Sequence, residues 1–153
     1  MTEAFLQVPD DYETLREALA SEITPAAIDK GLVLVPSAVT DAWSDIAAEL
    51  SQAFELTQQA ARAGGPVTYI VQAADLLGQL GAGRAMVACG LLSGARTLAF
   101  ETRKQGIAAN VLATEPASPP ELVARWARRL LEAGGPSGEV VRLGAGHVGK
   151  ALP

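Results

Sequence analysis

The chain has 153 residues and a formal net charge of −5, and 49% of its residues are hydrophobic. This length suits one compact domain, and the apolar content excludes a disordered chain. The acidic balance argues against binding a phosphate backbone, which needs clustered Lys and Arg, so we expect no nucleic-acid partner. Gly31 is the only glycine before Gly64, and the other 14 of the 15 follow from Gly64 onward. A glycine-rich nucleotide loop is therefore excluded from the chain before Gly64.

Metal and membrane sites are not expected either. Cys89 is the only cysteine and His147 the only histidine, which excludes an internal disulfide and a thiolate or histidine metal cluster. The N-terminus lacks the basic and apolar regions of a signal peptide. The charge-free run Ala85–Ala95 is far shorter than the roughly 20 residues that span a bilayer. We expect a cytoplasmic protein without a bound metal.

Short β-rich runs alternate with helix-length segments, which predicts an α/β domain. The continuous apolarity of Gly31–Val35 indicates a strand that is covered on both faces, as in a parallel sheet. In chain order, strands are expected at residues 4–8, 31–35, 67–71, 107–112 and 139–143. Helices are expected from Asp10 or Asp11 to Pro25, from Thr40 or Asp41 to about Ala63, from Gly83 to Lys104, and from Ser118 to Gly134.

The segment Gly83–Lys104 has apolar residues on two stripes and no charge between Arg84 and Arg96. A surface helix needs only one apolar stripe, so burial on two sides is predicted. The sheet can cover one side, and another subunit or another helix of the same domain must cover the other; we favour the subunit. Seven residues are predicted at this interface: Phe54, Met86, Cys89, Gly90, Ser93, Gly94 and Thr97.

Three further residue groups have structural interpretations. Cys89 lies on an apolar stripe without a cationic neighbour, so we expect a buried, inert thiol. Trp43 and Trp126 have the spacing of core residues. The cluster of arginines near the C-terminus is expected on a solvated helix face: Arg125, Arg128 and Arg129.

Five segments occur in an order and spacing that are typical of one enzyme family. Leu32–Ala38 is similar to a strand that ends in Asn-Asn-Ala-Gly, and Phe54–Gln58 to a Phe-x-x-Thr-Gln run. Leu98–Glu101 followed by Gly106–Asn110 is similar to Leu-Ala-x-Glu … Gly-Ile-x-Val-Asn, and the segments 120–124 and 137–141 match a last helix and strand. From Leu32 to Val148 the chain resembles the short-chain dehydrogenase/reductase (SDR) family, particularly its ketoacyl-reductase-like members.

The resemblance implies where the catalytic residues of that family would lie. Its Tyr-x-x-x-Lys pair, in which the lysine lowers the pKa of the tyrosine, corresponds to Arg84 and Ala88. The family's serine corresponds to Val71 or Gln72, and its asparagine to Glu49. All four positions are changed, and neither arginine nor alanine exchanges a proton near neutral pH.

This chain also lacks the cofactor-binding motif of the family. Only one strand–helix unit fits before Leu32, and its turn, Pro9-Asp10-Asp11, has no glycine. Dinucleotide binding needs a glycine turn at a helix N-terminus, so we expect no NAD(P) and no other cofactor. Residues 144–149 read G-x-G-x-x-G, but only four residues follow, which is too few for the helix and strand that the motif requires. His147 is expected in a C-terminal turn rather than in a catalytic site.

The sequence thus predicts a single truncated SDR-like domain with a Rossmann-like three-layer fold and a mostly parallel sheet of about five strands. Residues 1–31 form a divergent strand–helix unit, and residues 32–148 the SDR-like part. The first hypothesis is an inactive subunit that forms a homodimer or pairs with a complete reductase through its two long helices. The alternative is a small enzyme, or a protein that binds acyl groups or small acids, which uses Glu49, Asp75 and Arg84 in the old substrate crevice.

Overall fold

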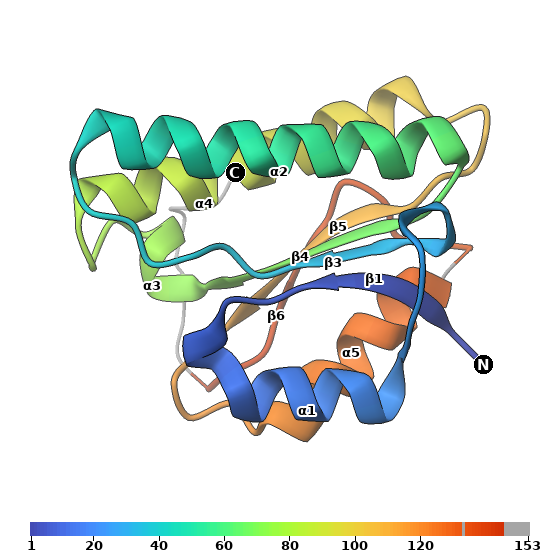
Figure 1. Cartoon of the computed structure of the whole chain (residues 1–153), viewed down its shortest axis with the longest axis horizontal. Helices are drawn as coiled ribbons and strands as arrows, with labels where there is room; N and C mark the ends of the chain where they lie inside the picture. Colours follow the sequence, from blue (N-terminus) through green and yellow to red (C-terminus); the bar gives the residue numbers. More distant parts are fainter. Residues whose placement is uncertain (133, 146–153) are drawn as a thin grey trace.

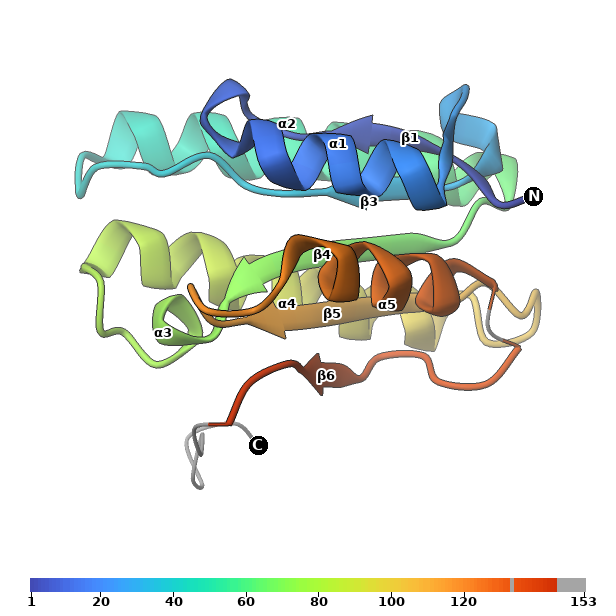
Figure 2. The same ribbon diagram turned by 90° about the horizontal axis from the view of Figure 1, so that it is seen from below.

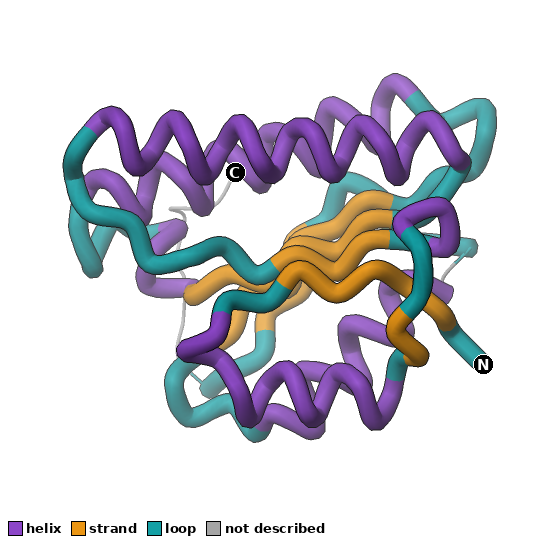
Figure 3. Tube along the Cα trace, in the orientation of Figure 1, coloured by secondary structure: helices purple, strands orange, loops and turns teal. Residues whose placement is uncertain are grey.

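The computed structural model describes residues 1–132 and 134–145, which form a central sheet with helices on both faces (Figure 1). Within these residues the sheet has six strands in the order β2-β1-β3-β4-β5-β6, and every neighbouring pair is parallel. The strands in Figure 3 are β1 (Glu3–Gln7), β2 (Thr24–Pro25), β3 (Leu32–Leu34), β4 (Val67–Gln72), β5 (Ala109–Thr114) and β6 (Val140–Arg142). The α/β, Rossmann-like architecture is confirmed, with six strands in place of about five.

The additional strand is β2, which the sequence analysis interpreted as a helix end at Pro25. The N–H groups of Thr24 and Ala26 donate to the carbonyl oxygens of Thr2 and Ala4, each at 2.9 Å. Pro25 lies between them, where a backbone N–H would point away from β1. Proline is therefore tolerated, because β2 is an edge strand and that position contributes no hydrogen bond to the sheet.

The helices cover the two faces in pairs. Their bounds are α1 (Glu13–Glu22), α2 (Trp43–Ala63), α3 (Ala73–Leu76), α4 (Ala82–Glu101) and α5 (Pro120–Glu132), with short 3₁₀ helices η1 (Asp10–Tyr12) and η2 (Ile28–Lys30). α2 and α4 lie side by side on one face, and α1 and α5 on the other (Figure 2). The four-residue α3 was not predicted, since it is too short to show a helical period. In the described part of the chain, no helix is long and apolar enough to cross a membrane.

Each face of the sheet has its own hydrophobic core. Leu32 and Leu34 of β3 pack into the core under α2 and α4, whereas Val33 and Val35 pack into the core under α1 and α5. Burying such a side chain contributes about 1.5–3 kcal/mol. Burial on both faces of the sheet therefore explains why Leu32–Val35 is apolar at every position, as the sequence analysis expected.

Two residues that were expected in buried positions, Trp43 of α2 and Cys89 of α4, are exposed. Trp43 is 67% exposed, and Phe54, which was predicted at an interface, is 64% exposed. The expectation of a buried thiol was wrong because α4 buries the side that contains Leu91 and Ala95, and its Cys89 side faces outward. Trp126, in contrast, packs against the core under α1 and α5.

The solitary early glycine serves the connection from β2 to β3. Gly31 has φ of +146°, and a Cβ atom there would lie 3.2 Å from the carbonyl oxygen of Pro66. The same carbonyl accepts the N–H of Leu32 at 2.8 Å. Doubly wound sheets commonly have the strand order 3-2-1-4-5-6, in which a third strand lies outside the second. Among the described residues, β2 is the edge strand, and no strand lies outside it. The positive φ of Gly31 permits the short return from β2 to β3.

Candidate functional site

The strand order reverses between β1 and β3, where the chain moves outward to β2 and then returns to the other side of β1. Open α/β sheets bind ligands at the carboxyl ends of the strands at such a point. A crevice lies here, lined by residues that follow β1, β3, β4 and β5 and by the first turns of α4. Its lining residues include Tyr12, Leu15, Val35, Pro36, Ser37, Ala38, Val71, Gln72, Asp75, Arg84, Ala88 and Thr114.

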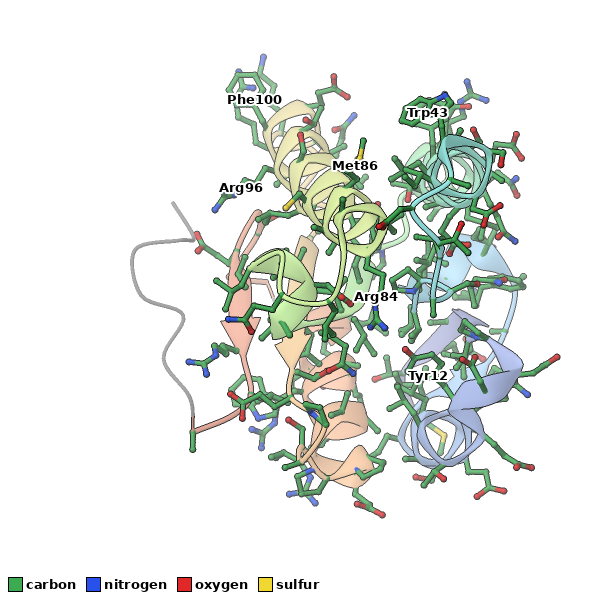
Figure 4. All side chains as sticks on the ribbon, turned by 90° about the vertical axis from the view of Figure 1, so that its left-hand side faces the viewer. Tyr12, Trp43, Arg84, Met86, Arg96 and Phe100 are labelled. Carbon is green, nitrogen blue, oxygen red and sulfur yellow. The ribbon has the colours of Figure 1, made fainter. Side chains whose placement is uncertain are left out.

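Tyr12 narrows this crevice. The 3₁₀ helix η1 follows β1 directly, and the N–H of Tyr12 donates to the carbonyl oxygen of Pro9 at 3.1 Å, which turns the tyrosine towards Arg84 (Figure 4). Burial raises the pKa of Tyr12, and the positive charge of Arg84 opposes that rise. The remaining cavity has a volume of about 40 Å³. Such a volume admits water-sized molecules and is far below the 300–1,000 Å³ of typical ligand pockets.

Asp75 and Arg84 form a bidentate ion pair across the crevice. Arg84 Nε donates to Asp75 Oδ1 at 2.8 Å, and Arg84 Nη2 donates to Asp75 Oδ2 at 3.0 Å. The hydrogen bond to Asp75 raises the pKa of Arg84, and the carboxylate itself is nearly buried. The two charges neutralise each other, and the pair uses two of the five N–H donors of the guanidinium.

Of the three predicted ligand residues, the structure brings together Asp75 and Arg84 but not Glu49. Glu49 Oε1 accepts the backbone N–H of Ser37 at 2.9 Å and so holds the loop after β3. Glu49 therefore lies beside the crevice without lining it.

Four of the five positions that the resemblance assigns to catalytic residues converge, and the fifth, Glu49, does not. Val71, Gln72, Arg84 and Ala88 all line the same crevice, although they come from β4 and α4. Valine and alanine have no exchangeable proton, and arginine keeps its proton at neutral pH. These four side chains therefore line one crevice, and none of them can act as an acid or a base near neutral pH.

The turn after β1 does not fit a dinucleotide. Pro9 has no backbone N–H to offer a phosphate, and Asp10 and Asp11 place carboxylates where a pyrophosphate would lie. Asp10 is held there by Arg16, with Nη2 to Oδ1 at 2.8 Å. The negative charges of these two carboxylates would repel a phosphate at this turn, whereas a glycine loop attracts one with its backbone N–H groups.

The remaining candidates from the sequence are a metal site, His147 and the arginines of α5. Residues 1–132 and 134–145 contain no group of three acidic, histidine or cysteine side chains that could hold a metal. His147 and most of the segment 144–149 lie outside the described residues. Arg128 pairs with Glu22 and Glu132, each at 3.0 Å, and Arg129 lies 5.4 Å from the ring centroid of Trp126.

A second hollow lies between α2 and α4 and has a volume of about 500 Å³. Its floor contains Tyr69 of β4, whose hydroxyl hydrogen-bonds to Thr57 at 2.6 Å and whose burial raises its pKa. A Cβ atom on Gly90 would lie 2.8 Å from Leu50 Cδ2, so Gly90 brings α2 and α4 of the same chain together. A Cβ atom on Gly94 would find its nearest neighbour, the Tyr69 hydroxyl, at 3.8 Å. Gly94 therefore faces the open groove.

Five of the seven predicted interface residues line this groove: Phe54, Gly90, Ser93, Gly94 and Thr97. Met86 and Cys89 lie on the outward side of α4 next to it. The sequence analysis missed Leu50, Thr57, Gln58 and Ala61, although their spacing from Phe54 is helical and could have identified them. It also missed Tyr69, which is a strand residue and reaches the groove only through tertiary packing.

No family model matches the sequence, and no curated protein matches it. Solved structures do match. The TT0495 protein from Thermus thermophilus is similar with a TM-score of 0.65 and 18% identity, covering 92% of this chain and 96% of that one. A short-chain dehydrogenase/reductase from Serratia marcescens BCRC 10948 is similar with a TM-score of 0.67 and 18% identity, covering 93% and 95%. The chain therefore has an SDR-like fold, with the shortened sheet described above.

Proposed function

We propose that this chain is a non-catalytic subunit with an SDR-like fold, which assembles through the outer face of α2 and α4. The partner is either a second copy or a complete reductase. The observation that supports this proposal best is the contrast between the two hollows. The crevice at the carboxyl ends is filled by its own side chains, whereas the apolar groove between the helices is open.

The absence of catalysis follows from the residues of the crevice. A reductase needs a group that gives or takes a proton beside the reacting carbonyl, and a cofactor that supplies hydride. Arg84 is tied to Asp75, and Ala88 replaces the second member of the expected pair. The turn at Pro9 excludes the pyrophosphate. Titration calorimetry with NADH and NADPH at about 1 mM is expected to give no binding heat, and a saturable signal would contradict the proposal.

Assembly follows from the apolar surface that the fold leaves uncovered. Trp43 and Phe54 on α2, and Met86 and Phe100 on α4, are 67%, 64%, 46% and 68% exposed. Trp43, Met86 and Phe100 all point away from the sheet (Figure 4). Large apolar side chains that are exposed together on one side of a protein indicate an interaction site.

The substitution Gly94→Leu tests this assignment. The leucine would project into the groove without a clash in its own chain, since the nearest atom to a Cβ is 3.8 Å away. The protein should fold but lose its partner, because the added side chain occupies the contact. Light scattering coupled to size exclusion measures the assembly, with circular dichroism as the test of folding. Gln59→Leu, an exposed position of α2 outside the groove, is the matched control and should keep the assembly.

An unchanged assembly for folded Gly94→Leu would contradict the assignment of the groove. A wild-type chain that stays monomeric, alone and in a lysate from its own source, would contradict the assembly itself. These outcomes separate the location of the interface from its existence.

One observation favours the alternative function, ligand binding in the crevice. The side-chain oxygen of Gln72 lines the crevice, is buried, and accepts no hydrogen bond from the described residues. A small donor could satisfy it. A thermal-shift screen of acyl thioesters and small acids tests this alternative, which requires stabilisation that disappears in Arg84→Ala.

A further inference from the structure

The groove between α2 and α4 is narrow at Gly90 and opens further along α4. At the narrow end Leu50 fills the space beside Gly90, where a Cβ atom would lie 2.8 Å from Leu50 Cδ2. About one turn further along, a Cβ atom on Gly94 would have its nearest neighbour at 3.8 Å. The lining continues to Glu101, about 16 Å beyond Gly90 along the helix axis. The volume of about 500 Å³ lies within the roughly 300–1,000 Å³ of typical ligand pockets, so a small molecule fits.

The floor of this groove has a hydroxyl proton without an acceptor in the described part of the chain. The hydroxyl oxygens of Thr57 and Tyr69 are 2.6 Å apart, and either could be the donor. Each hydroxyl has one proton, and their contact uses only one of the two. Thr102 donates its proton to the carbonyl oxygen of Leu98 one turn earlier, but Thr57 makes no such bond within residues 1–132 and 134–145. Whichever oxygen donates, one O–H proton therefore remains available.

The surroundings of Tyr69 keep this donor in place. Tyr69 is 2% exposed, and burial raises its pKa, so its hydroxyl stays protonated at neutral pH. Gly94 has no side chain to cover the hydroxyl. In the free protein water can accept the remaining hydrogen bond, but an apolar molecule without an acceptor would displace that water and leave the donor unsatisfied. The floor therefore discriminates between ligands with and without an acceptor.

Charge restricts the ligand further. Among the described residues that line the groove, only Glu101 carries a charge, and its carboxylate is exposed at the wide end. The other lining residues are apolar or uncharged. A negatively charged ligand would be repelled by Glu101 and would find no cation in the lining.

We propose that the groove binds a small, mainly apolar molecule without negative charge, whose oxygen accepts the hydrogen bond that the Thr57–Tyr69 pair leaves free. The oxygen of a ketone, an ester or an ether has this chemistry. The inference goes beyond the proposed function and does not rest on it. Ligand binding requires the two hydroxyls on the floor, whereas assembly uses the outward side chains of Trp43, Met86 and Phe100.

Three probes with the same two rings test the ligand chemistry. Benzophenone has an uncharged ketone oxygen, diphenylmethane has no acceptor, and 4-benzoylbenzoate adds a carboxylate to the ketone. The wild type should bind benzophenone about fivefold more tightly than diphenylmethane, the ratio that one net hydrogen bond provides. It should bind 4-benzoylbenzoate more weakly than benzophenone, and Glu101→Gln should narrow that difference. NMR titrations of the full chain measure the dissociation constants.

Variants of the floor locate the binding site. Thr57→Val/Tyr69→Phe removes both hydroxyls with little change of shape and should bind benzophenone and diphenylmethane equally. A purely structural role of the two hydroxyls would instead weaken both probes together. Each single variant keeps one hydroxyl and its proton, and should keep the preference for the ketone. Gly94→Leu fills the groove and should abolish binding of both probes, whereas Gln59→Leu, outside the groove, is the matched control and should bind normally.

A partner that covers the groove would compete with the probes, so the titrations are repeated on Met86→Ser/Phe100→Ser, whose outward face is less apolar. Failure of benzophenone to bind either form overturns this inference and leaves the proposed assembly standing. A ketone preference that survives in Thr57→Val/Tyr69→Phe, or unchanged binding by folded Gly94→Leu, also overturns it. A monomeric wild type that binds benzophenone with the expected preference supports this inference and contradicts the proposed function.

Discussion

The crevice at the carboxyl ends of the strands and the groove between α2 and α4 each contain a tyrosine, but their surroundings differ. Tyr12 lies beside the Asp75–Arg84 pair in a cavity of about 40 Å³. Tyr69 lies on the floor of an apolar groove of about 500 Å³, where its hydroxyl hydrogen-bonds to Thr57. In the crevice, the two charged groups Asp75 and Arg84 satisfy one another. In the groove, the described residues leave apolar surface uncovered.

Under the proposed function, this difference is the one expected of a fold that has lost its chemistry and kept its capacity to associate. Catalysis depends on a few polar side chains and on a glycine turn, so a handful of substitutions removes it. Association depends on the extended apolar side of two long helices, which many residues share. The following predictions test whether the crevice is held by internal pairing and the groove is left free.

The largest effect is expected for Asp75→Ala. It leaves the Arg84 guanidinium in the crevice without its carboxylate, which should lower the free energy of unfolding by about 3 kcal/mol. Urea denaturation followed by circular dichroism measures the change. The double variant Asp75→Leu/Arg84→Met removes both charges and should recover most of the loss. Equal destabilisation of the single and double variants would contradict the internal pairing.

Tyr12→Ala should have the next largest effect, about 2 kcal/mol, because it empties the centre of the crevice but removes a side chain that is only partly buried. The same urea denaturation measures it. Tyr12→Phe keeps the ring and should cost much less. A stability loss as large for phenylalanine as for alanine would show that the hydroxyl, and not the filling of the crevice, is what matters.

In the groove, Gly94→Ala should increase the free energy of unfolding by about 1 kcal/mol through helix propensity, since its Cβ meets no close neighbour. Gly90→Ala gains the same propensity but pushes against Leu50 Cδ2 at 2.8 Å, so its net change should be near zero. The two variants, compared at one protein concentration, differ only in the contact. Equal gains would contradict the close approach of α2 and α4 at Gly90.

The smallest effect concerns alkaline pH. Burial raises the pKa of both tyrosines of the chain above the ordinary value of about 10. The unfolded chain therefore loses these protons first, so the stabilisation is complete below about pH 10 and is lost as the pH rises further. Tyr12→Phe should reduce this loss by less than about 1 kcal/mol near pH 10.5. An identical pH dependence in wild type and variant would contradict the burial of the Tyr12 hydroxyl.

Much of the fold could be predicted from local patterns. The run Gly31–Val35 is apolar at every position except the glycine, and only a parallel strand between two helical layers buries both of its sides. The turn at Pro9 lacks glycine, and this is the basis of the expectation that no dinucleotide binds there. The two-residue strand β2 and the single-turn α3 could not be predicted, because neither is long enough to establish a period.

The candidate site was predicted only in part. Asp75 and Arg84 were chosen together, and their convergence needed the resemblance to place them at one crevice. Tyr12 was interpreted only as a helix residue, since its contact with Arg84 joins segments that are far apart in the chain. The outward direction of Trp43 and Cys89 was missed as well. An apolar stripe has the same period whether it faces a core or a partner.

The sequence by itself therefore determined the order of the longer strands and helices, the layers, and the residue types at the positions that the resemblance assigns to catalysis, because each of these is a matter of residue type and spacing. Only the tertiary structure decided which side of α4 faces the sheet, that Tyr12 fills the crevice, and that Gly94 opens into a groove while Gly90 contacts Leu50. These features depend on how helices rotate about their axes when two faces of a sheet are packed at once. Local periodicity leaves that rotation undetermined, and packing fixes it.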